Sequence, residues 1–179
     1  NMNSPDGVIL SCLGLELSKE EKFFFKSTNP FGFVLFKRNF KTREQLTELI
    51  NQLRNITKNK QILIFIDQEG GKVQRLVGCG FSKFHPQKFF GDIYLKDKNK
   101  ALDLAYKSSF LLGSELNSIN INVNFSPVCD LLFPGAHSII GSRAFHSNPL
   151  IVYELSKAFC SGLKDSGVYP VLKHFPGHG

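Results

Sequence analysis

The sequence lacks the features that mark disulfide-rich, zinc-binding and membrane-spanning proteins. Its four cysteines include no C-x-x-C pair, and three of them lie in apolar runs, where a thiol behaves as a small hydrophobic group. We therefore expect all four to be reduced and buried. No apolar run approaches the roughly 18 residues that span a bilayer, and no secretory leader pattern is present. These absences predict a cytoplasmic protein without a membrane span, unless a leader has been removed.

Acidic residues are also few. The chain has 15 Asp and Glu against 22 Lys and Arg, which gives a formal charge of +7 and a pI near 9.3. Such a balance favours an anionic substrate or partner. The lysines are dispersed, however, and no known nucleic-acid-binding motif is present, so we expect no nucleic-acid partner.

The composition is that of a folded domain. Hydrophobic residues make up 42% and charged residues 21% of the chain, which excludes a disordered or collagen-like polymer. The length of 179 residues suits one domain, but it falls short of the roughly 250 residues of a complete eight-stranded β/α barrel. We therefore predict a single domain over residues 1–179.

Short apolar runs alternate with helical patterns along the chain. The runs predict five strands, at residues 8–15, 31–36, 61–67, 123–130 and 168–174. Capping residues and apolar spacing predict helices starting after Ser18 and Thr42, and over residues 102–116 and 151–163, the last capped by Asn148. Residues 70–98 have no clear period and predict a long loop with one turn of helix.

This alternation predicts a mainly parallel sheet with right-handed crossovers. A nucleotide-binding sheet would carry a glycine-rich phosphate turn after its first strand, and none is present. A barrel instead places polar residues at the C-terminal ends of several strands. Such groups follow four of the runs: Lys37–Asn39, Asp67–Glu69, Asp130 and Lys173–His174. We therefore predict an α/β fold of the (β/α)8 TIM-barrel type, present as an N-terminal partial barrel with about five parallel strands.

The segment D-Q-E-G-G-K-V-Q-R, residues 67–75, combines two carboxylates, two glycines and an arginine. The Asp67 carboxylate can accept hydrogen bonds from adjacent hydroxyls, and the forked Arg75 guanidinium can donate others. This pattern predicts binding of a polyhydroxylated molecule, with Glu69 supporting the loop. The structural alternative is that Asp67 only caps backbone amides at the end of a strand.

The chain ends in K-H-F-P-G-H-G, residues 173–179. Lys173 and His174 lie at a predicted strand end and are candidates for ligand binding, although His174 could equally be a hydrogen-bonded core histidine. His174 and His178 are four residues apart, but the intervening Pro176 and Gly177 disfavour a helix, and the zinc-protease Glu is missing. We therefore expect no metal site.

Three segments together resemble glycoside hydrolase family 3, and in particular its bacterial β-N-acetylglucosaminidases. They are D-Q-E-G-G-K-V-Q-R, I-G-S-R-A-F (residues 140–145) and K-H-F-P-G-H-G, in the family's order and near its spacing. The resemblance covers the chain from Val8 onward. It implies a (β/α)8 barrel, of which this chain supplies the N-terminal part. Lys72 and Ser142 depart from the family's commoner residues, and we expect both changes to affect loop packing more than chemistry.

The resemblance also implies an activity. It is the retaining exo-hydrolysis of terminal N-acetylglucosamine from 1,6-anhydromuramyl peptides in peptidoglycan recycling, without metal or organic cofactor. Asp67 would accept hydrogen bonds from the sugar, Arg75 and Arg143 would donate to it, and Lys173 and His174 would complete the site. The nucleophilic Asp and the acid/base His are expected beyond Gly179, so we predict no catalytic residue in this chain and no activity of the chain alone.

Two other functions remain open, namely another family 3 β-glycosidase, such as a β-glucosidase, and an inactive sugar-binding piece. The expected ligand is a muropeptide or another saccharide that contains N-acetylglucosamine. A partial barrel leaves strand edges and apolar faces uncovered. We therefore expect it to associate with the missing barrel half or with a second copy of itself.

Overall fold

The computed structural model describes residues 5–57, 59 and 61–178. Its main sheet has five strands in the order β1-β2-β3-β6-β7, and every neighbouring pair is parallel. The bounds are β1 Asp6–Leu10, β2 Pro30–Leu35, β3 Leu63–Ile66, β6 Val123–Asn124 and β7 Tyr169–Pro170. The predicted α/β fold with about five parallel strands is therefore confirmed.

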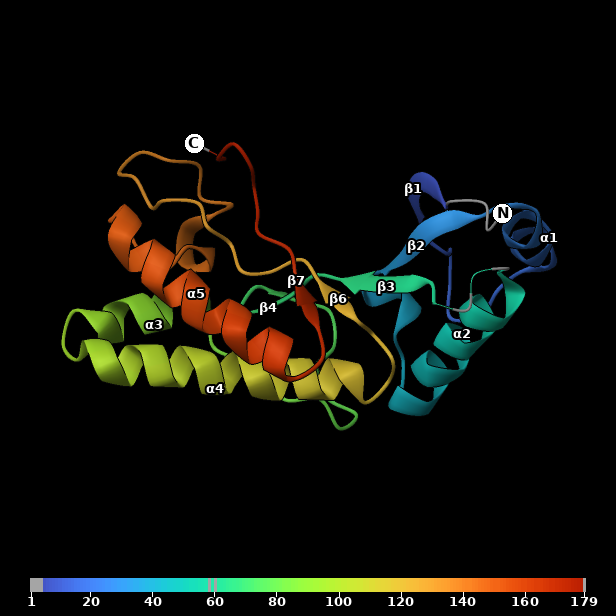
Figure 1. Cartoon of the computed structure of the whole chain (residues 1–179), viewed down its shortest axis with the longest axis horizontal. Coiled ribbons are helices and arrows are strands. Elements are labelled where there is room, and N and C mark those ends of the chain that lie inside the picture. Colours follow the sequence, from blue (N-terminus) through green and yellow to red (C-terminus); the bar gives the residue numbers. More distant parts are fainter. Residues whose placement is uncertain (1–4, 58, 60, 179) are drawn as a thin grey trace.

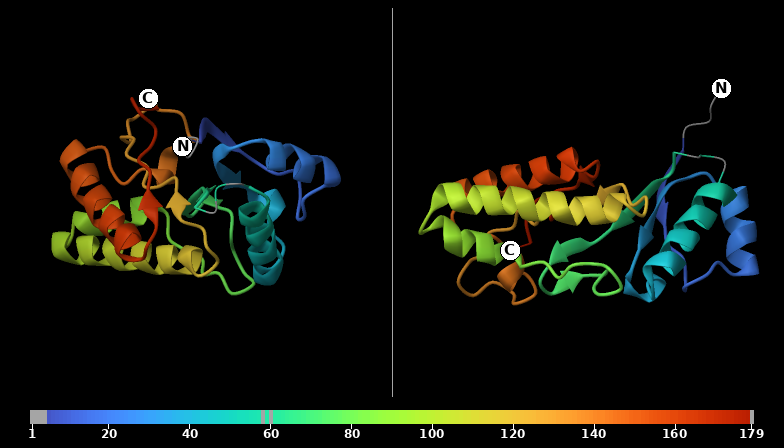
Figure 2. Two further views of the ribbon diagram at one scale, coloured as in Figure 1. Left: turned by 45° about the vertical axis from the view of Figure 1, so that its right-hand side comes forward. Right: turned by 90° about the horizontal axis from the view of Figure 1, so that it is seen from below.

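Five α-helices connect and cover these strands: α1 Lys19–Ser27, α2 Arg43–Ile56, α3 Gln87–Tyr94, α4 Lys98–Asn117 and α5 Pro149–Asp165. Figures 1 and 2 show α1 and α2 beside β1, β2 and β3, while α3, α4 and α5 pack together beside β6 and β7. Two 3-10 turns, Lys37–Asn39 and Gly141–Arg143, lie in the loops. No helix in the described ranges is long and apolar enough to cross a membrane.

Three helices, α1, α2 and α5, begin at the capping residues that the sequence predicts. The Ser18 side chain accepts a hydrogen bond from the Glu21 amide, and Glu21 accepts one from the Ser18 amide, which completes a capping box. Thr42 and Asn148 cap α2 and α5 through their side chains. Each cap satisfies backbone amides that have no partner within the helix.

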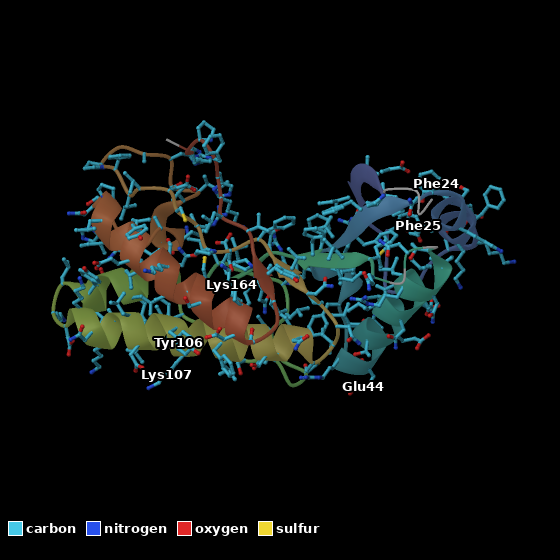
Figure 3. The ribbon with its side chains drawn as sticks, in the orientation of Figure 1. Phe24, Phe25, Glu44, Tyr106, Lys107 and Lys164 are labelled. Atoms are coloured by element: carbon cyan, nitrogen blue, oxygen red, sulfur yellow. The ribbon has the colours of Figure 1, made fainter. Side chains whose placement is uncertain are left out.

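The core lies between the sheet and the helices. The apolar face of α2 buries Leu46, Leu49, Ile50 and Leu53, as the predicted spacing requires. On α1, Phe25 is buried while its neighbour Phe24 is half exposed, and Figure 3 labels both side chains. In the same view Lys107 lies on the outer surface of α4. Dispersed lysines of this kind are typical of a solvated helix surface.

The fourth and fifth strands are shorter than predicted. Each keeps only two residues in the hydrogen-bonded part of the sheet. A proline, which has no backbone N–H to donate, lies close to each strand: Pro127 after β6 and Pro170 within β7. The two segments nevertheless run side by side beyond this point. The Cys129 amide donates to the Lys173 carbonyl oxygen at 2.7 Å. The residues that follow β6 and β7 therefore lie next to each other at one end of the sheet.

Residues 70–98 are more ordered than predicted. A small antiparallel hairpin pairs β4, Gln68–Gly70, with β5, Val73–Gln74. Its turn uses Gly70 and Gly71, both with positive φ, and a Cβ atom at either glycine would press against the 84–86 segment. The helix that follows, α3, has eight residues rather than one turn. Period-based reasoning missed the hairpin because its strands are only two and three residues long.

The cysteine prediction holds in part. All four cysteines are free, and Cys12 is buried, while Cys129 and Cys160 are partly buried. Desolvation raises the pKa of Cys12 and Cys160 to about 11, so both thiols stay protonated at neutral pH. Cys79 is exposed, against expectation, because it lies between two glycines in a surface turn and itself has a positive φ.

Candidate functional site

The predicted site residues meet in one cleft at the carboxyl ends of the strands. Asp67 follows β3, Lys173 and His174 follow β7, and Arg143 ends the second 3-10 turn. Figure 1 shows the C-terminal segment rising beside the loop that follows β6. The cleft has a volume of about 760 Å³, and its lining includes all five predicted residues: Asp67, Arg75, Arg143, Lys173 and His174.

Asp67 is a partly buried acceptor held by two cations. Its Oδ1 lies 2.8 Å from Lys173 Nζ, and its Oδ2 lies 3.4 Å from Arg75 Nη2. Burial alone would raise the pKa of Asp67, but Lys173 and Arg75 outweigh burial and hold that pKa below its usual value. In the described part of the chain Asp67 bonds to side chains and not to backbone amides, so the backbone-capping alternative is wrong.

Glu69 is a buried acceptor that binds Arg143 and shares Lys173 with Asp67. Its two carboxylate oxygens accept hydrogen bonds from Arg143 Nε at 2.9 Å and Arg143 Nη2 at 2.8 Å. The same carboxylate lies 2.6 Å from Lys173 Nζ. Only 1% of the Glu69 side chain is exposed, and the hydrogen bonds that Arg143 donates to Glu69 raise the pKa of Arg143. Glu69 thus supports the site from inside, as its predicted role requires.

His174 is oriented by a buried carboxylate. His174 Nδ1 lies 2.5 Å from Asp130 Oδ2, and the Asp130 side chain is only 3% exposed. Asp130 Oδ1 also accepts the backbone amide of His178 at 2.8 Å. With Nδ1–H donating to Asp130, the opposite nitrogen, Nε2, is directed toward the cleft and lies 3.4 Å from Arg143 Nη2. Because 37% of the His174 side chain is exposed, the alternative of a core histidine is wrong.

Asp130→Asn should destabilise the protein by about 1 kcal/mol at neutral pH, because a charge-assisted hydrogen bond is lost. Burial raises the pKa of Asp130, but the hydrogen bonds from His174 and the two backbone amides outweigh burial and hold that pKa below its usual value. A depressed pKa stabilises the folded state above the unfolded pKa, and this contribution disappears as the pH falls through the folded pKa. Urea unfolding at neutral pH and at a series of lower pH values should therefore show a deficit for the variant that shrinks as the pH falls. A deficit that stays the same across this series would contradict the charged role of Asp130.

The sequence reasoning missed three contributors to the site. The sequence places Asp130 at a strand end but does not predict its pairing with His174. Gln68 is 1% exposed, and its Oε1 accepts the Arg75 amide at 2.8 Å and so fixes the backbone beneath Arg75. Lys72 lines the cleft, whereas the sequence analysis expects it to affect loop packing more than chemistry. Its position in the D-Q-E-G-G-K motif, close to Asp67 and Glu69 in the sequence, could have indicated that it lies near the cleft.

Two other predictions concern the polar group after β2 and the binding of a metal ion. Asn39, in the polar group after β2, is buried and donates to the carbonyl oxygens of Cys12 and Gly14. The polar group after β2 therefore holds the loop after β1 and does not line the cleft. Within the described ranges, no three His, Cys, Asp or Glu side chains are grouped in a way that could hold a metal ion.

The sequence matches one protein family over nearly its whole length. Residues 7–179 match the family described as Glycosyl hydrolase family 3 N terminal domain. The beta-hexosaminidase of Bordetella avium is 35% identical over 175 residues, which cover 98% of this chain and 49% of the relative. That of Xylella fastidiosa strain M23 is 37% identical over 172 residues, covering 96% of this chain and 50% of the relative. This chain therefore spans about half the length of the curated relatives it matches.

Solved structures agree with the sequence matches. NagZ from Neisseria gonorrhoeae superposes with a TM-score of 0.92 at 36% identity, covering 98% of this chain and 51% of that one. The same protein in complex with N-trifluoroacetyl-D-glucosamine also gives 0.92. A family 3 β-N-acetylglucosaminidase from Paenibacillus gives 0.85 at 31% identity, covering 96% of this chain and 32% of that one. The chain, with its five parallel strands and its cleft at their carboxyl ends, belongs to glycoside hydrolase family 3 and forms an N-terminal partial barrel of that family.

Proposed function

We propose that this chain is the N-terminal half of a retaining exo-β-N-acetylglucosaminidase. The enzyme removes terminal N-acetylglucosamine from 1,6-anhydromuramyl peptides during cytoplasmic peptidoglycan recycling. The observation that carries the proposal is the convergence of Asp67, Arg75, Arg143, Lys173 and His174 on one cleft. The relatives named beta-hexosaminidase, and the NagZ complex with N-trifluoroacetyl-D-glucosamine, support the choice of sugar.

Each residue has a role that its hydrogen bonds permit. Asp67 is ionised and has lone pairs left for the hydroxyls of the terminal sugar. Arg75 and Arg143 donate to the sugar oxygens, each from a guanidinium already oriented by a carboxylate. Lys173 and His174 supply further polar contacts at the strand end. The chain's contribution is thus to bind and orient the sugar before reaction.

The bond-breaking groups are proposed to lie outside these 179 residues. A retaining glycosidase needs a nucleophile and a separate acid/base on either side of the scissile bond. In the proposed arrangement both come from the second half of the barrel, so this chain forms the sugar-holding wall. We expect no turnover by the 179-residue chain alone.

The uncovered face of the sheet supports pairing with that second half. An apolar groove of about 440 Å³ is lined by Phe31, Leu63, Phe65, Val123, Tyr169 and Val171, which come from four neighbouring strand segments. Strands β1 and β7 each pair on one side only in the described part of the chain. Because matched relatives are about twice as long as this chain, we propose that the rest of the barrel packs against this groove and these edges.

A specificity assay tests the proposed function. The protein that contains this chain in full should hydrolyse a chromogenic β-N-acetylglucosaminide. It should leave the matching β-glucoside largely intact. Preference for the glucoside would favour the family's β-glucosidase activity. Absence of turnover with both would favour the non-catalytic alternative.

Arg143→Ala should lower kcat/KM for the N-acetylglucosaminide by about 30-fold or more. This corresponds to a loss of at least about 2 kcal/mol, because a charged donor to the sugar is removed. Lys107→Ala is the matched control, because Lys107 is 67% exposed on α4 and far in sequence from the site. If the Arg143→Ala enzyme is as active as the control, Arg143 does not contact the sugar.

A further inference from the structure

Gln87, the first residue of α3, binds the backbone of Val128 at two points. Its side-chain Nε2 donates to the Val128 carbonyl oxygen at 2.8 Å, and its Oε1 accepts the Val128 amide, also at 2.8 Å. Both residues are buried, and buried backbone amides and carbonyls need partners. The pairing of β3 with β6 ends at Ile66 and Asn124, so Val128 lies beyond it. The Gln87 amide therefore takes the place of a neighbouring strand.

The backbone around Val128 holds Lys173 on its other side. The Lys173 amide donates to the Pro127 carbonyl oxygen at 3.3 Å, and the Cys129 amide donates to the Lys173 carbonyl oxygen at 2.7 Å. In an extended chain, successive residues direct their N–H and C=O groups to opposite sides. Val128 therefore faces Gln87, while the residues before and after it face Lys173. A shift of this segment would move the backbone of Lys173 with it.

The segment that Gln87 fixes also determines where two side-chain groups of the site lie. The Lys173 ammonium binds both carboxylates at the centre of the site. Asp130 follows Val128 closely in the chain and holds the Nδ1 atom of His174. Gln87 is not among the described residues that line the cleft. It can therefore act on a bound sugar only through the residues that it positions.

Helix α3 is itself fixed against the loop that carries Arg143. Gly91, one turn after Gln87, packs closely against Phe145. A Cβ atom at Gly91 would lie 1.9 Å from the Phe145 carbonyl oxygen, so the close approach requires glycine. Phe90 of the same helix is buried in the core. Because α3 is held in this way, Gln87 is a rigid support for Val128.

We propose that Gln87 is a positioning residue for the sugar site, which it serves by holding Lys173 and the Asp130–His174 pair through the backbone of Val128. This inference rests on the proposed function and adds to it a residue that the sugar does not touch. Removal of the Gln87 amide leaves two buried backbone groups unpaired, which is costly unless the segment moves. The groups that bind the sugar are then displaced, and small displacements in a catalytic site reduce the rate strongly.

Gln87→Met tests the proposal, because methionine is unbranched and flexible enough to fill the same space but has no amide. The protein that contains this chain in full is assayed with a chromogenic β-N-acetylglucosaminide. Gln87→Met should raise KM by about 10-fold, whereas a loss of folded enzyme alone would lower the maximal rate and leave KM unchanged. Gln52→Met is the matched control and should keep KM, because Gln52 bonds to Glu48 within α2 and lies outside the described lining of the cleft.

The hydrogen bond between His174 Nδ1 and Asp130 gives a second readout, which needs no turnover. The proton of a short, charge-assisted hydrogen bond gives a signal at low field in the proton NMR spectrum. His174→Gln identifies this signal by removing it. Gln87→Met should move the signal to higher field, because the Asp130 carboxylate is displaced, and Gln52→Met should leave it in place.

The outcomes separate the role of Gln87 from the proposed function. An unchanged KM in Gln87→Met would overturn the positioning role while the glycosidase stands. If the unsubstituted protein hydrolyses no N-acetylglucosaminide, the proposed function fails, and the NMR signal decides: a shift in Gln87→Met supports the positioning role, and an unchanged signal overturns it. If Gln87→Met does not fold, Gln87→Asn, whose amide is one methylene shorter, replaces it in both measurements. A smaller rise in KM is then expected, and an unchanged KM overturns the proposal.

Discussion

Asp67→Ala is expected to lower kcat/KM for a chromogenic β-N-acetylglucosaminide by at least about 30-fold, equivalent to about 2 kcal/mol of transition-state stabilisation. The substitution removes the ionised acceptor of the cleft. It also leaves the Nη2 atom of Arg75 without its carboxylate partner, so that a second sugar contact loses its orientation. Steady-state kinetics on the full-length protein measure the effect. Asp92→Ala is the control, because Asp92 is an exposed residue that pairs with Lys88.

Stability data distinguish binding from folding in this variant. Lys173 keeps Glu69 as a partner at 2.6 Å when Asp67 is lost, so the free energy of unfolding should change much less than the barrier to hydrolysis. A kcat/KM equal to that of the control would show that Asp67 does not contact the sugar. A fall in activity matched by global unfolding would show that Asp67 acts through the fold.

Glu69→Gln is expected to lower the free energy of unfolding by about 3 kcal/mol. Glu69 is nearly fully buried and neutralises Arg143 and Lys173, whose side chains are only 11% and 13% exposed. Removing the charge of Glu69 leaves the buried Arg143 without its carboxylate partner and Lys173 with Asp67 alone, which is far more destabilising than loss of a surface pair. Urea denaturation at neutral pH measures the difference.

Asp103→Asn is the matched control for this stability effect. Asp103 pairs with Lys107 one helical turn away on α4, and both side chains are more than half exposed. Its loss should change the free energy of unfolding by no more than about 0.5 kcal/mol. A similar small effect for Glu69→Gln would mean that water screens the Glu69 pairs, and the account of a buried support for the site would be wrong.

Sequence patterns predicted the scaffold well where the physical signal was strong. Continuous apolar runs identified β2 and β3, and the capping residues Ser18, Thr42 and Asn148 fixed the starts of three helices. The weak points were β6 and β7, where prolines interrupt the ladder and only two residues remain in each strand. Local propensity does not report such interruptions, because the flanking segments stay extended and side by side.

The sequence predicted which strand ends carry the site residues, but it did not predict which of these residues pair with one another. Polar residues after β3 and β7 had to meet because parallel strands bring their carboxyl ends to one edge. The pairing of Asp130 with His174 joins residues 44 positions apart, and it depends on the register of β6 and β7, the two shortest strands of the main sheet. Arg143 entered only through the family resemblance, since no periodic pattern places the 140–145 loop over the cleft.

A crystal structure of the full-length protein with N-acetylglucosamine bound tests the central claim most directly. The account predicts that the sugar lies in the 760 Å³ cleft, with its hydroxyl oxygens hydrogen-bonded to Asp67, Arg75 or Arg143, and Lys173 or His174. A sugar bound elsewhere, or bound in the cleft without contact to Asp67 and the cations around it, would contradict the assignment of this chain as the sugar-holding half of a family 3 glycosidase.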